Sequence, residues 1–158
     1  MRQELQDPFT DKPRLQASIK LANDIYRLHE AGHDYSSELT QLSILAGQSI
    51  SKFSVESAFG SISPEGFARE LICDLTAIPT NLTPDEMLEL IKHIITADGD
   101  TFQMWYWLQC LQVNTGDNKF SDLIYWPGEY FKDGNNAREM SPQEILDTAL
   151  NTGKKCRT

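Results

Sequence analysis

The sequence has few cysteines, no long apolar run and no apolar segment near its start, and each shortage excludes a class of protein. Its three cysteines (Cys73, Cys110 and Cys156) are an odd number without metal-site spacing, which favours reduced thiols. No apolar stretch is long enough to span a bilayer, and the opening residues lack the apolar core of a signal peptide. We therefore expect a cytoplasmic protein that does not associate with membranes.

Basic residues are scarce too. The 158 residues include 14 Lys and Arg against 23 Asp and Glu, a formal net charge of −9. A phosphate backbone would repel such a chain, which argues against nucleic acid as its direct partner. Residues 81–150 alone hold twelve acids and four bases, a net charge of −8. This balance favours a basic protein as the partner.

Helical patterns fill most of the chain, and no convincing run of alternating β-branched residues occurs, so an all-α fold is predicted. Ser63, Thr83 and Ser141 each precede a proline, as at a helix start, and the last two belong to capping boxes. Gly32 and Gly47 are predicted to end helices. The predicted helices span residues 12–31, 36–46, 53–59, a segment from 63, a segment from 83, residues 101–113 and a segment from 141.

The stretch Ala77–Leu82 contains Pro79 and is the predicted boundary between two parts of the chain. Residues 1–80 form a helical extension and residues 81–158 form a second helical domain. The connection is too short for a flexible tether, so we expect the extension to pack against the domain. The basic tail, residues 154–157, is predicted to be disordered.

The segment Ser121–Pro127 reads as a single helical turn: Asp122 is predicted to cap its start, and Pro127 to end it. Tyr125 and Trp126 then project from the surface beside an acid, an arrangement typical of a protein-binding hot spot. The residue types alone equally allow both rings to lie in the core.

This segment and its flanks resemble the immunity proteins of DNase-type colicins and pyocins, over residues 81–153. An acidic helix from Thr83 ends in an Ala-Asp turn, a second helix and the short aromatic turn follow, and a last helix starts at Ser141-Pro142. The resemblance implies a four-helix bundle with a one-turn third helix, here preceded by a packed helical extension. It also implies a protein that is not an enzyme and that inhibits a cognate basic nuclease toxin by binding it.

In that family the second helix and the third turn grip the toxin beside its active site. The matching third-turn residues here are Asp122, Tyr125, Trp126 and Pro127, with Trp126 where the family usually has a second tyrosine. The second helix departs from the family because no acid follows Asp100. A non-DNase toxin is therefore an alternative partner.

The spacing within residues 101–113 predicts two stripes. Met104, Leu108 and Leu111 are spaced to face the core, and the second stripe is predicted to face outward: Trp105, Gln109 and Gln112. These three residues are predicted to bind the partner. The alternative is that Trp105 packs under the extension.

A rival motif, His29-Glu30-Ala-Gly-His33, matches the zinc-peptidase pattern H-E-x-x-H, with Glu38 or Glu56 as possible third ligands. A zinc hydrolase is thus a second hypothesis. Gly32 argues against it, because a helix end there would move His33 off the face that His29 shares. No other catalytic pattern, phosphate loop or calcium loop occurs, so we expect no metal and no cofactor.

Overall fold

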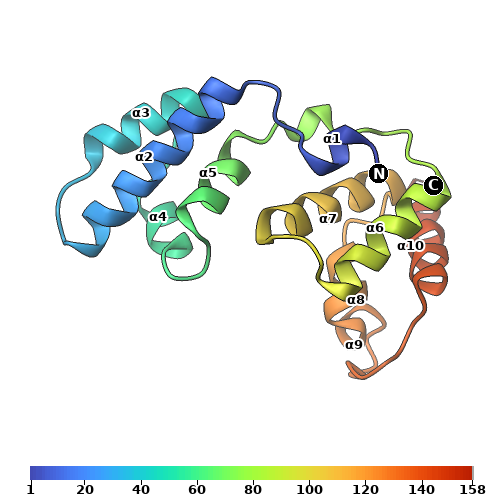
Figure 1. The fold of residues 1–158 in the computed structure, drawn as a ribbon. Coiled ribbons are helices and arrows are strands. Elements are labelled where there is room, and N and C mark those ends of the chain that lie inside the picture. Colours follow the sequence, from blue (N-terminus) through green and yellow to red (C-terminus); the bar gives the residue numbers. More distant parts are fainter. Residues whose placement is uncertain (158) are drawn as a thin grey trace. The chain divides into compact units, whose positions relative to one another are not determined.

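A computed structural model describes residues 1–157 of the chain, which are helical wherever they are regular and contain no strand (Figure 1). The all-α prediction is confirmed. The chain divides into two compact units. One, here called the insert unit, is Asp7–Asp74; the other, the main unit, consists of Met1–Gln6 and the residues from Leu75 onward. We describe each unit by itself.

The insert unit has four helices: α2 (Lys12–Glu30), α3 (Ser36–Ala46), α4 (Lys52–Ala58) and α5 (Pro64–Ile72). The long helix α2 packs against both α3 and α5. The core is apolar, and its buried members include Ala22, Ile25, Tyr26, Leu42, Val55, Phe67 and Ala68. The side chain of Ser63 accepts a hydrogen bond from the Gly66 amide, as the proline-based start predicts, and Gly47 ends α3 with a φ of 70°.

The main unit contains α1 (Gln3–Gln6), a 3₁₀ turn η1 (Leu75–Ala77), α6 (Pro84–Thr96), α7 (Thr101–Thr115), α8 (Phe120–Tyr125), α9 (Pro127–Tyr130) and α10 (Pro142–Arg157). Helix α10 packs against α6, α7 and α8, and α7 also packs against α6 and α8. The predicted capping box at Thr83 and Glu86 is present, and Asp100 and Gln103 form another. These caps set the starts of α6 and α7.

The first six residues belong to the main unit although 68 residues of insert separate them from its remainder. Leu5 is buried, with 1% of its surface exposed, and its carbonyl oxygen accepts a 2.9 Å hydrogen bond from the indole nitrogen of Trp107. The Arg2 guanidinium pairs with the Glu86 carboxylate. The chain therefore passes from one unit to the other at residues 6/7 and 74/75. The predicted boundary was a single one at 80/81, with the first residues in the extension.

The tail is helical, which corrects the prediction that residues 154–157 are disordered. Helix α10 continues to Arg157. Gly153 lies so close to the end of α7 that a Cβ atom built on it would be 1.8 Å from the carbonyl oxygen of Thr115. This close backbone contact holds the last turns of α10 against α7, an effect that composition cannot reveal. None of the helices in residues 1–157 has the length and hydropathy of a membrane span.

Candidate functional site

Helix α8 carries the aromatic turn that the sequence singled out. It begins after Lys119, whose amide donates to the carboxylate of Asp117 at 3.0 Å. Asp122 lies inside the helix, and its backbone carbonyl accepts a 2.7 Å hydrogen bond from the Trp126 amide. The prediction that Asp122 caps the turn is therefore wrong. No side chain caps the first turn of α8, and the Asp117 carboxylate binds the amide of Lys119, the residue just before the helix.

The inner face of α8 is fixed in the core, and its outer end is exposed. Phe120 is fully buried, and Leu123 keeps only 2% of its surface. By contrast, Tyr125 is 45% exposed and Trp126 is 57% exposed. The alternative in which both rings lie in the core is thereby excluded. We call Tyr125 and Trp126 the aromatic pair.

Pro127 has a different place from the predicted one. It is buried, and although α8 ends just before it at Tyr125, as predicted, Pro127 also occupies the first position of α9. Its fixed φ suits that position, where the missing amide hydrogen costs no helical bond. The Trp126 carbonyl accepts hydrogen bonds from the amides of Glu129 (2.9 Å) and Tyr130 (3.0 Å). The backbone of Trp126 is thus hydrogen-bonded through both its amide and its carbonyl, while its side chain is exposed. Pro127 is buried and therefore not accessible to a partner.

A polar brace supports α9 next to the aromatic pair. The Tyr130 hydroxyl donates to Oδ2 of the fully buried Asp117 (2.7 Å) and lies 2.6 Å from the Thr152 hydroxyl of α10. Burial raises the pKa of Tyr130 to about 12. Gly128 packs against the backbone of Gly134, which leaves no space for a side chain there. This brace could not be predicted from the sequence, because Asp117 in a turn and Tyr130 in a polar segment carry no signal of contact.

Helix α7 buries a different stripe from the predicted one. Its buried residues are Phe102, Tyr106, Trp107, Cys110, Leu111 and Thr115. Of the predicted core stripe only Leu111 is buried; Met104 and Leu108 are half-buried, so that prediction is wrong for two of three residues. The observed stripe includes Trp107, whose buried indole finds a partner for its N–H in the Leu5 carbonyl.

The three α7 residues predicted to bind a partner, Trp105, Gln109 and Gln112, are all half-buried. The Trp105 ring lies 5.7 Å from that of Phe102, in a tilted arrangement. Each of the three keeps some accessible surface, but none is as exposed as the aromatic pair. Asp122 is also half-buried.

The zinc-peptidase pattern does not assemble. Helix α2 ends at Glu30, and Gly32 adopts a φ of 71°, so His33 lies beyond the helix. His29 is engaged elsewhere: its Nδ1 lies 3.1 Å from the Tyr35 hydroxyl, and its ring packs edge-on against Phe59. Within residues 1–157 no three His, Cys, Asp or Glu side chains gather in a way that would hold a metal ion.

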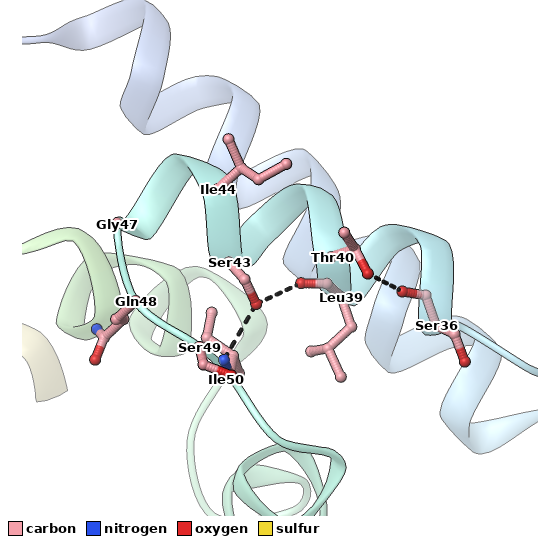
Figure 2. Close-up of a pocket in the computed structure, with 9 residues that line it drawn as sticks. All are labelled: Ser36, Leu39, Thr40, Ser43, Ile44, Gly47, Gln48, Ser49 and Ile50. Atoms are coloured by element: carbon pink, nitrogen blue, oxygen red, sulfur yellow. Dashed lines mark hydrogen bonds between the residues drawn. The ribbon is translucent and has the colours of Figure 1, made fainter.

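The insert unit has an open groove of about 630 Å³ along α3 (Figure 2). Three of its hydroxyl groups are hydrogen-bonded within the unit. Ser36 donates to the Asp34 carboxylate at 2.6 Å, and Thr40 donates to the Ser36 carbonyl at 2.9 Å. Ser43 donates to the Leu39 carbonyl at 2.8 Å and accepts from the Ile50 amide at 3.1 Å. No acid, base or thiol lines the groove. It offers contact surface and no catalytic group.

Comparisons of the chain with family models, curated proteins and solved structures found no match. Among the surfaces described here, the aromatic pair combines the largest rings, a fixed backbone and a nearby acid.

Proposed function

We propose that this protein is an inhibitor that acts by stoichiometric binding, an immunity protein for a basic nuclease toxin of the DNase-bacteriocin type. The observation that carries the proposal is the exposure of Tyr125 and Trp126 on a helix end whose opposite face is buried. Large rings on a fixed backbone bury much area on binding and lose little conformational freedom, which is the property of interface hot spots.

Charge supports the same kind of partner. Residues 81–150 carry a net charge of −8, so a basic toxin is attracted and its association is accelerated. Burial of the aromatic pair then slows dissociation. In this proposal the protein performs no chemistry: it covers the toxin beside its active site and excludes DNA by steric overlap and charge.

The packing of the main unit is compatible with the proposed bundle. Helices α7 and α10 both pack against the short helix α8, and each of them also packs against α6. We infer that α8 corresponds to the one-turn third helix of the immunity family. We propose that this unit is the immunity-like domain, that it acts in the cytoplasm, and that the insert unit is an addition to it.

The test uses the full chain as bait in a lysate of the source strain. The wild type should retain a basic protein that Trp126→Ala retains weakly. The matched control is Phe53→Ala, since Phe53 is also a strongly exposed aromatic (74%) but lies in the insert unit. The captured protein is then purified and its nuclease activity titrated with the chain. Inhibition that is complete at one chain per nuclease supports the proposal, whereas equal capture by all baits or an uninhibited nuclease contradicts it.

One observation favours a second candidate partner. Helix α7 carries no acid from Thr101 to Thr115, although the resemblance would place several there. A toxin with another chemistry, such as an RNase, would then be bound by the same aromatic pair. The titration distinguishes the two when it is run on both DNA and RNA substrates.

A further inference from the structure

A groove of about 380 Å³ lies in the main unit, lined by residues of α6, α8, the loop before α10 and α10. Leu123 and Ile145 are buried at its base. Ile95, which is 47% exposed, and the half-buried Ile124 line its sides. Ile124 directly precedes Tyr125, so the groove is built on the same helix as the aromatic pair.

The charged residues of the groove are Arg138 and Glu139, and only one of them is compensated. The Arg138 guanidinium pairs with Asp133 and lies 4.3 Å above the ring of Phe131. Glu139 is exposed and has neither an ion pair nor a hydrogen-bond partner for its carboxylate among residues 1–157. The uncompensated charge at this apolar groove is therefore negative.

We propose that the groove accepts one lysine or arginine side chain of the partner, and that Glu139 is a specificity-determining residue. This inference rests on the proposed function, since it concerns the same basic partner. Long basic side chains bury their aliphatic stems along apolar surface and keep the cationic end polar. Ile95, Ile124 and Met140 cover the stem, and the Glu139 carboxylate binds the cation.

Other occupants fit less well. An acidic side chain would meet the unpaired Glu139 carboxylate, while the Arg138 charge is paired with Asp133. The Arg138 Nε has no hydrogen-bond partner among residues 1–157, but it is buried and so is not accessible to a side chain in the groove. A second copy of the chain would bring two net charges of −9 together, which opposes association. A wholly apolar side chain would leave the carboxylate without a partner.

The test measures the affinity and association rate of chain variants for the purified nuclease that wild-type bait retains. Removal of the Glu139 charge (Glu139→Gln) should raise Kd about 10-fold, and its reversal (Glu139→Lys) about 100-fold or more. Ile95→Ala should weaken binding several-fold by removing part of the groove wall. The matched control is Glu144→Gln: Glu144 is an exposed acid on α10 that does not line the groove, so Kd should stay within about twofold.

The results separate this inference from the proposed function. If Trp126→Ala abolishes binding while Glu139→Gln and Ile95→Ala bind like the wild type, the groove is empty in the complex. The groove proposal is then wrong, and the proposed function still stands. Tighter binding of Glu139→Lys would show that Arg138 binds an acid, and would also overturn it. If no nuclease is retained, or if Trp126→Ala has no effect, the proposed function fails and this inference with it. Circular dichroism confirms that each variant is folded.

Discussion

The hydroxyl group of Tyr130 donates a 2.7 Å hydrogen bond to the carboxylate of Asp117, whose side chain has no exposed surface. The second oxygen of that carboxylate accepts from the Lys119 amide, and the same hydroxyl lies 2.6 Å from Thr152. One buried acid thus connects the turn before α8 with α9 and α10. These segments surround the aromatic pair, so the brace fixes the surface that we propose binds the toxin.

The brace predicts the effect of removing one hydroxyl. Tyr130→Phe leaves a buried carboxylate with one donor fewer, and it should destabilise the main unit by about 1–3 kcal/mol. Urea unfolding followed by tryptophan fluorescence measures this, because all three tryptophans lie in the main unit. Tyr125→Phe is the control, since its hydroxyl is on an exposed ring and a change below about 0.5 kcal/mol is expected. Equal stability of the two variants would contradict the role of the brace.

Alkaline pH should weaken the same unit through Tyr130. Burial raises the pKa of this phenol from its ordinary 10.0 to about 12 in the folded chain. Between these two values the unfolded chain has released the proton and the folded chain retains it, so stability falls as pH rises. Below pH 10 the contribution is fully present. Urea midpoints measured from pH 9 to 11.5 should decrease, and less steeply in Tyr130→Phe; parallel decreases in both proteins would count against this.

The contact between α10 and α7 tolerates no side chain at residue 153. In Gly153→Ala the new Cβ atom would meet the Thr115 carbonyl oxygen at 1.8 Å, so the two helices must separate. A loss of about 3 kcal/mol is expected from such overpacking. Asn151→Ala on the exposed face of α10 serves as the control and should change stability little. Thermal unfolding monitored at the tryptophans distinguishes the two.

The pairing of Arg2 with Glu86 makes the attachment of the first helix sensitive to acid. The hydrogen bond from Arg2 lowers the pKa of the Glu86 carboxyl below its ordinary 4.5. Stability from this pair is therefore present above pH 4.5 and is lost as pH falls through the lower, folded-state value. Below pH 4.5 the exchange of the Trp107 indole proton, which is bonded to Leu5, should become faster. Arg2→Gln should show fast exchange already at neutral pH; an unchanged rate would contradict this attachment.

Much of the fold could be predicted from local signals. Ser63, Thr83 and Ser141 each cap a helix as expected, because proline and hydroxyl signals act within one turn of the chain. Gly47 ends α3 at the predicted residue for the same reason. The exposure of the aromatic pair agrees with the predicted turn, in which the aliphatic residues face inward.

Two of the errors depend on residues that are distant in sequence. The buried face of α7 includes Trp107, whose indole is hydrogen-bonded to Leu5, 102 residues away in the sequence. The helical tail is held by the close contact between Gly153 and Thr115 of α7. The misplaced cap of α8 is a local error, since Asp117 lies only two residues before Lys119. Helix α8 ends before Pro127 as predicted, and the same fixed φ also allows this proline to begin α9, which was not predicted. Local patterns cannot distinguish these outcomes.

The histidine pair should bind no zinc. His33 is beyond the end of α2, and His29 contacts Tyr35 and Phe59, so the two rings do not share a helix face. Metal analysis of protein purified without chelator should find far less than one zinc per chain. His29→Ala should not alter any zinc content that is found. One tightly held zinc per chain, lost in His29→Ala and in His33→Ala, would revive the hydrolase hypothesis.

The aromatic pair gives the most direct prediction for the partner. Tyr125→Ala and Trp126→Ala should each weaken binding of the captured nuclease by about 2 kcal/mol or more, mainly through faster dissociation. Because both side chains are largely exposed and their backbone bonds do not involve the rings, the far-ultraviolet circular dichroism should be unchanged. Trp105→Ala, at a half-buried ring, should weaken binding less. If both variants of the pair bound the nuclease as tightly as the wild type does, the interface would have to lie elsewhere on the chain.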